Sequence, residues 1–361
     1  MFHLPEYHSP DFSLPAMRCA PDARTAPVFI DGTAPEGFHA TSIFPEYFRI
    51  NGEWQLAEES RMDCCVVVTD SGLKVVEPRN LKKGDLVITG RSEDCSEGIF
   101  LNSTPFHTPS GVQDTFSFRT GRSRETAHGK DYDTLADLLR YEKEHGRIIW
   151  VLGPACSFDE SARKSMQALT ENGYVHALLA GNALATHDLE AAYFQTALGQ
   201  NIRTQESVHN GHYHHLDVIN KVREAGSISA FIEKNDIQNG IMYGLVKNHI
   251  PFVLAGSIRD DGPLPEVIGN VYKAQKAMRE EISKATTVIA LATQLHTIAT
   301  GNMTPAFRVQ DGIIRPVYFY TIDISEFAGG KLRDRGSLYS VNLVTNVQDF
   351  LSRIAYKTGS L

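Results

Sequence analysis

The segment PFVLAGSIRDDGPLPE, residues 251–266, joins an apolar run to a polar loop with two adjacent carboxylates. The apolar half predicts a buried strand, and Gly256 and Ser257 follow it directly. Asp260 and Asp261 come next, in a polar loop at the end of that strand. We therefore assign Asp260 and Asp261 as candidate catalytic residues.

Small or polar residues also follow the other predicted strands. They are Gly153-Pro154 after RIIWVL, Gly181-Asn182-Ala183 after VHALLA, Gln294-Leu295-His296 after VIALAT, and Asp323 after VYFYTI. In an open parallel sheet, ligands bind outside the carboxyl ends of the strands, where glycine permits close approach of the backbone. Glycine also follows strands in α/β folds that bind nothing at that point. Taken together, the turns favour a nucleotide crevice.

Neither standard phosphate-binding motif supports this crevice, because the chain has no G-x-G-x-x-G and no G-x-x-x-x-G-K-[ST]. Asp323 resembles the acidic residue that binds a ribose hydroxyl in dinucleotide-binding folds. It could equally cap the segment that follows it.

Histidine is concentrated in HNGHYHHLDVIN, which contains His209, His212, His214 and His215. A metal site is the less favoured interpretation, because the segment has no H-E-x-x-H motif and no nearby cysteine, and we assign no metal ligand. We expect one of these histidines, His215, to face the crevice as a proton carrier, since histidine titrates near neutral pH. The alternative is a polar helix start without a catalytic role.

Cys156 lies in the first strand-end turn, where the start of a helix could lower the pKa of its thiol. No base partner is evident in the sequence, so we interpret Cys156 as lining the crevice. The arginines of SFRTGRSRE (Arg119, Arg122 and Arg124) could bind a carboxylate, although a solvated linker explains them slightly better.

Composition limits the possible partners. The net charge of −8 argues against a nucleic-acid partner, and no apolar run approaches the ~20 residues that span a bilayer. The N-terminal residues lack the basic and apolar regions of a secretory signal. Five cysteines without a C-x-x-C pair suggest reduced thiols. We expect a soluble cytoplasmic protein that acts on a small molecule.

The composition and the hydrophobic pattern of the sequence change along the chain. Residues 1–34 are expected to form an irregular arm, and short β-branched runs predict a small β-rich domain over residues 35–115. Residues 116–361 alternate buried strands with helical segments, which predicts βαβ units and a parallel sheet. The expected fold class is α/β, with a parallel-sheet domain after the β-rich domain.

Several segments together resemble the NAD-dependent ornithine cyclodeaminases of the archaeal type. These also form the C-terminal part of cyanobacterial arginine-dihydrolase fusion enzymes, and are described as "LOR/SDH bifunctional enzyme conserved domain" proteins. The matching segments are PEGFHATSIFPEYFRINGEW, MDCCVVV, LKKGDLVITG, GNALATHDLE, GHYHHLDVINKVREAGSI, GIMYGLVKNHIPFVLAGSIRDDGPLPEV and ATQLHTIATGNMTP. The likeness covers residues 35 to 351, nearly the whole chain.

The resemblance implies a modified Rossmann domain related to that of deoxyhypusine synthase, and a homo-oligomer. It also implies a tightly held NAD that is used and regenerated while ornithine, or a related diamino acid, becomes proline or a related cyclic imino acid with loss of ammonia. With NAD as the cofactor, the candidate cofactor-binding residues are Gly153, Pro154, Gly181, Asn182, Ala183, Gly256, Ser257, Asn302, Met303 and Asp323.

Two departures from the family pattern leave alternatives open. Family members usually carry a further N-terminal subdomain, where this chain has the expected arm. The usual His-Thr-Gly-Gly after Gly-Pro-Ala is replaced by a segment that includes Phe158, Asp159 and Glu160, and two acids would repel a phosphate. The alternatives are an amino-acid or imine oxidoreductase with net NADH turnover, and a catalytically lapsed NAD-binding partner protein.

Overall fold

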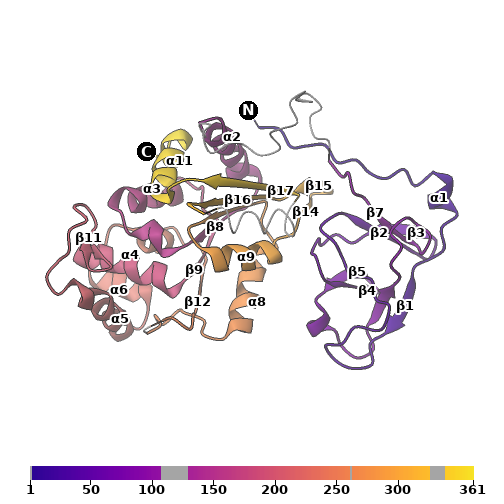
Figure 1. The fold of residues 1–361 in the computed structure, drawn as a ribbon, viewed down its shortest axis with the longest axis horizontal. Coiled ribbons are helices and arrows are strands. Elements are labelled where there is room, and N and C mark those ends of the chain that lie inside the picture. Colours follow the sequence, from indigo (N-terminus) through magenta and orange to yellow (C-terminus); the bar gives the residue numbers. More distant parts are fainter. Residues whose placement is uncertain (1, 107–128, 261, 326–337) are drawn as a thin grey trace.

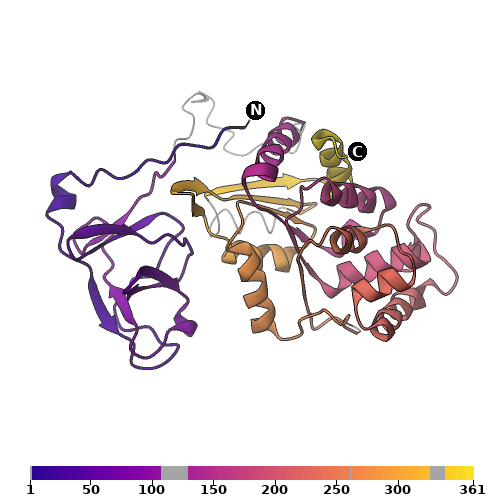
Figure 2. The same cartoon turned by 180° about the vertical axis from the view of Figure 1, so that it is seen from behind.

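The computed structural model describes residues 2–106, 129–260, 262–325 and 338–361. Asp261 and the arginines Arg119, Arg122 and Arg124 lie outside the described residues, and their proposed roles stay predictions. Figure 1 shows a small β-rich domain beside a larger α/β domain, and Figure 2 shows the same two bodies from behind.

The small domain consists of two antiparallel sheets. The first has the strand order β1-β6-β4-β5, with β1 at Arg24–Pro27, β4 at Cys65–Thr69, β5 at Gly72–Val76 and β6 at Leu86–Thr89. The second has the order β3-β2-β7, with β2 at Glu46–Ile50, β3 at Glu53–Leu56 and β7 at Ile99–Leu101. Phe48, Val66, Ile88 and Ile99 form a buried cluster between them. β-Branched residues suit such pleated, half-buried surfaces.

The N-terminal segment contacts both domains and is not irregular throughout. It contains α1 (Pro15–Arg18) and strand β1, which pairs with β6 in the first sheet. Nε1 of Trp54 donates a hydrogen bond to the carbonyl of Met17 (3.1 Å). Phe2 packs against Tyr141 and Tyr318 of the α/β domain, with ring centroids 5.2 and 5.7 Å away. The segment therefore runs from one domain to the other (Figure 1).

The α/β domain is built on six parallel strands in the order β12-β9-β8-β13-β16-β17. Their bounds are β8 Ile148–Leu152, β9 Ala177–Gly181, β12 Phe252–Ala255, β13 Thr287–Leu291, β16 Tyr318–Asp323 and β17 Tyr339–Val344. In chain order the strands run 3-2-1-4-5-6, which is the Rossmann arrangement. The strand order reverses between β8 and β13, so a ligand crevice is expected there. The predicted α/β fold class is confirmed.

Helices cover both faces of this sheet. They are α2 (Gly129–His145), α3 (Glu160–Glu171), α4 (Asn182–Phe194), α5 (His214–Ala225), α6 (Ile228–Lys234), α7 (Ile241–Lys247), α8 (Val271–Ile282), α9 (Gln294–Met303) and α11 (Val347–Thr358). Smaller elements are the 3-10 helices η1 (Pro78–Asn80), η2 (Pro154–Ser157) and η3 (Gly211–Tyr213), and the hairpins β10–β11 (Thr196–Ala197, Gln200–Asn201) and β14–β15 (Phe307–Gln310, Ile313–Pro316).

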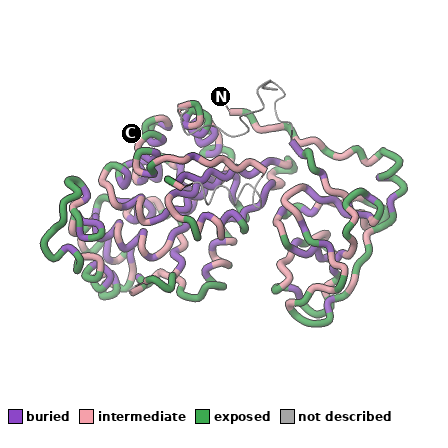
Figure 3. Tube along the Cα trace, viewed as in Figure 1, coloured by how far each residue is buried: buried purple, intermediate pink, exposed green. Residues whose placement is uncertain are grey.

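Strand β8 is a continuous apolar run because both faces of the sheet are covered at this strand. Trp150 and Leu152 pack into the core shared with α2, α3, α4 and α11, whereas Ile149 and Val151 pack into the core shared with α8 and α9. Successive side chains of a strand point to opposite faces, so both must be apolar when both faces are covered. Figure 3 shows the buried residues gathered in the sheet and in the inner sides of the helices. Among the described residues, no helix combines the length and apolar character needed to cross a membrane.

Candidate functional site

The turns after β8 and β13 touch at the point where the strand order reverses. The N–H of Gly153 donates to the carbonyl of Leu291 (2.8 Å). A Cβ at Gly153 would lie only 1.9 Å from the carbonyl oxygen of Ala292, so a side chain cannot fit there. Pro154 then opens η2. Glycine at this position lets two backbone segments meet at the expected ligand crevice.

The loop after β12 is tied to the start of α4 by Asn182. Its Nδ2 donates to the carbonyl of Gly262 (3.2 Å), and its Oδ1 accepts from the N–H of Leu264 (3.0 Å). Asn182 is buried, and Ala183 follows it in the first turn of the helix. Both polar groups of the Asn182 side chain thus hold the loop, and a direct contact with a cofactor stays a prediction.

Asp260 organises the same loop. Its Oδ2 accepts a hydrogen bond from the N–H of Ser257 (2.8 Å), and Gly256 donates to the carbonyl of Ile268 (3.0 Å). One carboxylate oxygen of Asp260 therefore shapes the loop, while the charge of the group remains at the edge of the sheet.

His296, in the first turn of α9, reaches the end of strand β9. A Cβ built at Gly181 would lie 3.1 Å from Cε1 of His296. Burial lowers the pKa of His296 below its usual value, and the nearby charge of Asp260 opposes this shift in part. The ring is thus a neutral base at pH 7. His296 had no assigned role among the candidates, and its place five residues beyond the end of β13 was the available signal.

His215 lies beside helix α4. It occupies the first turn of α5, with its ring centroid 6.1 Å from that of His187 in α4. His214 stacks on Phe194 with centroids 4.4 Å apart. Within the described ranges, no group of three or more His, Cys, Asp or Glu residues is arranged to hold a metal ion. The catalytic role of His215 stays a prediction.

Asp323 ends strand β16 and is buried. Its Oδ1 accepts a hydrogen bond from the N–H of Ser325 (2.9 Å). This contact ties the carboxylate to the backbone two residues on, and the cap of the following segment lies outside the described residues. The second carboxylate oxygen sits at the same edge of the sheet, so recognition of a ribose hydroxyl stays a prediction.

Three apolar side chains are exposed just beyond strand ends. Ile258, Leu295 and Ile324 follow β12, β13 and β16, with exposed fractions of 107%, 75% and 77%. They lie along the edge of the sheet that the glycine turns mark.

Cys156 is fully buried in η2, and burial raises the pKa of its thiol to about 12. The helix start does not lower it, because removal from water outweighs the local hydrogen bond. Cys156 is therefore a protonated core residue and not a nucleophile. All five cysteines are free thiols.

Asp159 and Glu160, the two acids of the segment that replaces His-Thr-Gly-Gly, both have partners within the protein. Asp159 caps α3, its Oδ2 accepting from the N–H of Ala162 (2.8 Å). Glu160 forms ion pairs with Lys164 (3.1 Å) and Arg203 (2.9 Å). Burial would raise the pKa of Glu160, but these two cations keep it below its usual value. These contacts weaken the expected repulsion of a phosphate, because the Asp159 carboxylate caps α3 and the Glu160 charge is neutralised by two cations.

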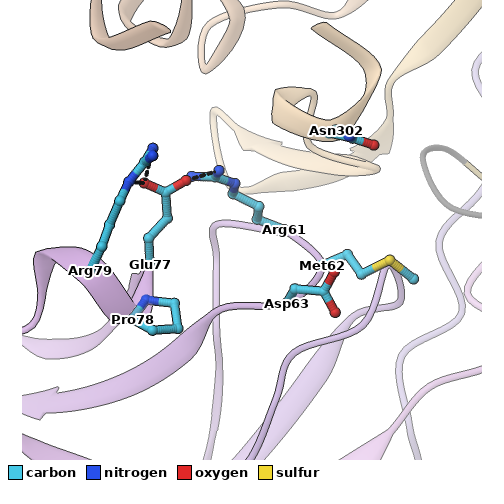
Figure 4. A pocket seen from close by; sticks show the side chains of 7 residues that line it. All are labelled: Arg61, Met62, Asp63, Glu77, Pro78, Arg79 and Asn302. Atoms are coloured by element: carbon cyan, nitrogen blue, oxygen red, sulfur yellow. Dashed lines mark hydrogen bonds and ion pairs between the residues drawn. The ribbon is translucent and has the colours of Figure 1, made fainter. Parts of the chain in front are cut away.

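Asn302 faces a cavity between the two domains. The cavity has a volume of about 380 Å³ and is lined by Arg61, Met62, Asp63, Glu77, Pro78, Arg79 and Asn302. Figure 4 shows Asn302 on one side and Asp63 on the other, with Arg61 and Arg79 both directed at the Glu77 carboxylate. Asn302 is six residues beyond His296, about 9 Å along α9, and Met303 is buried in the core. Their contact with a cofactor stays a prediction.

Comparison with known proteins places the chain in a family. Residues 133–354 match the family described as "Arginine dihydrolase ArgZ-like, C-terminal, Rossmann fold", and residues 45–126 match its "C-terminal, first region". The chain belongs to the ArgZ-like C-terminal family. An ornithine cyclodeaminase from Methanopyrus kandleri is 37% identical to this ArgZ-like chain, covering 92% of the chain and 77% of the relative.

Two solved structures extend this result. A conserved LOR/SDH protein from Methanococcus maripaludis S2 matches the ArgZ-like chain with a TM-score of 0.85 and 34% identity, over 94% of this chain and 98% of that one. AgrE, named as a bifunctional arginine dihydrolase/ornithine cyclodeaminase in Nostoc sp., has been solved in a ternary complex with ornithine and NAD⁺. That complex matches with a TM-score of 0.60 and 36% identity, over 96% of this chain and 47% of AgrE. The resemblance inferred from the sequence is confirmed.

Proposed function

We propose that the protein is an NAD-dependent cyclodeaminase that converts ornithine, or a related diamino acid, to proline or a related cyclic imino acid with release of ammonia. The observation that carries the proposal is the likeness to AgrE, which binds ornithine and NAD⁺ in one complex, over 96% of this chain. We place the reaction in the cytoplasm, and the five free thiols support a reducing compartment.

The strand-end turns suit a dinucleotide. Gly153 supplies a backbone without a side chain at the reversal point of the strand order, and Gly181 leaves room for His296. We assign Gly153, Gly181, Gly256 and the carboxylate of Asp323 to the cofactor. NAD would supply a reversible hydride acceptor, so that no net oxidation of the substrate is needed.

The remaining roles belong to side chains at the same edge. Asp260 supplies negative charge for the substrate ammonium group, and we assign the same role to Asp261. His296 is a half-buried neutral base that can take up a proton. Ile258, Leu295 and Ile324 would exclude water, which protects an imine from hydrolysis.

The test is incubation of the purified protein with ornithine and related diamino acids, after mass spectrometry of its co-purifying small molecules. We expect bound NAD, one ammonia released per cyclic amino acid formed, and no net change in NADH absorbance. Net NADH production would support the oxidoreductase alternative instead. Absence of bound dinucleotide, together with no thermal shift on adding NAD, would support the lapsed binding protein.

A variant pair tests the aspartates. Asp260→Asn should abolish turnover while the protein stays folded, because Asn keeps an oxygen for the N–H of Ser257 but loses the charge. Asp311→Asn, in the exposed turn of the β14–β15 hairpin, is the matched control and should leave turnover unchanged. Full activity of Asp260→Asn and of Asp261→Asn would remove both residues from the proposed mechanism.

A further inference from the structure

A partly buried polar cluster joins α4 to the start of α5. We name it the α4 cluster; it consists of His187, Glu190, Thr196 and His214. Oε1 of Glu190 accepts hydrogen bonds from Oγ1 of Thr196 (2.9 Å) and from the N–H of Gly199 (3.3 Å). Oε2 of Glu190 lies 2.8 Å from Nδ1 of His187. Glu190 is fully buried, and both of its carboxylate oxygens are engaged.

These contacts favour a proton on Nδ1 of His187. An ionised carboxylate only accepts hydrogen bonds, so Nδ1 of His187 is the donor to Glu190. Nε2 is then the acceptor nitrogen of the neutral ring. This is the arrangement in which a buried carboxylate holds the histidine of a catalytic triad in the tautomer that accepts a proton.

The same reasoning extends to the second histidine of the cluster. The hydroxyl proton of Thr196 is directed at Glu190. The hydroxyl oxygen therefore accepts from Nδ1 of His214, 2.7 Å away. Glu190 and Thr196 thus orient both rings.

His187 lies close to the proposed crevice. Its ring centroid is 5.6 Å from that of Phe158, in the loop that follows β8 and η2, and its side chain is 12% exposed. Helix α4 starts directly after β9, so His187 is five residues, or about 8 Å, along the helix from Asn182. The strands β8 and β9 are neighbours in the sheet. The loop with Phe158 follows β8 and helix α4 follows β9, so the His187 ring lies between segments that leave adjacent strand ends.

We propose that His187 is a proton acceptor for the substrate in the proposed cyclodeaminase and that Glu190 is its positioning residue. The inference rests on the proposed function. Nε2 takes one proton from the substrate ammonium group, leaving a neutral amine and an imidazolium ring whose Nδ1–H remains bound to Glu190. The imidazolium later returns that proton to the departing ammonia, so the ring ends the cycle neutral.

The first test reads the tautomer and does not depend on activity. In protein labelled with ¹⁵N-histidine, we expect the ring-nitrogen shifts of neutral His187 to report a proton on Nδ1. Glu190→Gln places an amide donor against Nδ1 and should move the proton to Nε2. Glu233→Gln, on an exposed position of α6, is the matched control and should leave the tautomer unchanged. A proton on Nε2 in the unaltered protein, or an unchanged tautomer in Glu190→Gln, overturns the positioning role.

The second test is kinetic. His187→Asn keeps an N–H group for Glu190 but removes the acceptor nitrogen, so kcat for ornithine should fall about 10²- to 10⁴-fold with little change in KM. Glu190→Gln should also lower kcat, and Glu190→Asp should have a kcat between those of Glu190→Gln and the unaltered protein. Wild-type kcat in His187→Asn overturns this inference alone. Absence of turnover in the unaltered protein, with the expected tautomer present, overturns the proposed function and with it the role of His187.

Discussion

Helix α4 carries two buried carboxylates, Asp188 and Glu190, on different sides and in opposite electrostatic settings. Asp188 faces α3 and α7, and its Oδ1 lies 2.8 Å from Nε of Arg163, which is also buried. Its two oxygens further accept from the N–H groups of Ile241 (3.0 Å) and Met242 (2.8 Å) at the start of α7. Glu190 faces α5, where its partners are a hydroxyl, an N–H group and a histidine.

The difference lies in whether the partner can change its charge. The guanidinium of Arg163 is always charged, so its pair with Asp188 is a fixed connection among three helices. Histidine can gain and lose a proton near neutral pH. Two carboxylates two residues apart therefore support different properties: Asp188 holds the domain together, and Glu190 controls a proton.

Removal of the Asp188 charge should cause the largest loss of stability. In Asp188→Asn, the buried Arg163 keeps its charge without a counterion, which typically costs about 3–5 kcal/mol. Urea unfolding of Asp188→Asn against the unaltered protein measures this cost.

A double variant serves as the control. Arg163→Met combined with Asp188→Asn removes both charges and should recover much of the lost stability. A loss below about 1 kcal/mol in Asp188→Asn, or no recovery in the double variant, would contradict the interpretation that the Arg163–Asp188 ion pair permanently connects α3, α4 and α7.

Glu190→Gln should destabilise the protein less. Its partners are not permanently charged, so no unpaired cation is left behind, and the cost should be about 1–3 kcal/mol from a mispaired buried hydrogen bond. The measurement is the same urea series, compared directly with Asp188→Asn. An equal or larger loss of stability in Glu190→Gln would remove the contrast between the two sides of α4.

Thr196→Val tests the link between Glu190 and His214, with a smaller effect. The substitution keeps the shape of the side chain and removes the hydroxyl, so Glu190 loses one of its donors. We expect a loss of about 1 kcal/mol in urea unfolding. The tautomer of His187 should be unaffected, because its own bond to Glu190 remains. A change in the His187 tautomer would show that the α4 cluster acts as one coupled unit.

The sequence predicted the parallel sheet because apolar runs such as RIIWVL alternate with helical segments and end in glycine. Strand β17 was not predicted: its residues, Tyr339–Val344, are mostly half-buried at the edge of the sheet and mix polar with apolar types. Edge strands lack the continuous apolar pattern of central strands, so periodicity alone does not reveal them.

The candidate site was predictable in outline only. Glycines at strand ends are visible in the sequence, whereas the partners of Asn182 lie about eighty residues away in the chain. The three-residue spacing of His187 and Glu190 on one helix face was a local signal that went unused. Thr196 and His214 meet only through tertiary packing of β10 against α5, which no local pattern encodes.

A third carboxylate, Glu77, extends the comparison to the junction between the domains. Its oxygens contact Arg61 and Arg79 of the small domain and Arg279 of α8 (2.6 Å). Burial alone would raise the pKa of Glu77, but the hydrogen bond from Arg279 and the charge of Arg61 outweigh it and lower the pKa to about 2. Like Asp188, Glu77 has permanently charged partners, but several of them are partly exposed.

Glu77→Gln should therefore show the clearest dependence on acid. The folded-state pKa of Glu77 lies below its ordinary value of 4.5, so its stabilising contribution is complete above that value and is lost as pH falls towards about 2. The melting temperature of the unaltered protein should fall more steeply over this range than that of Glu77→Gln. The matched control is Glu280→Gln, on the same helix as Arg279, which should keep the original slope. Identical slopes for the unaltered protein and Glu77→Gln would mean that the arginines do not keep Glu77 ionised. The distinction between permanently charged and titratable partners would then not account for the stability of the junction between the domains.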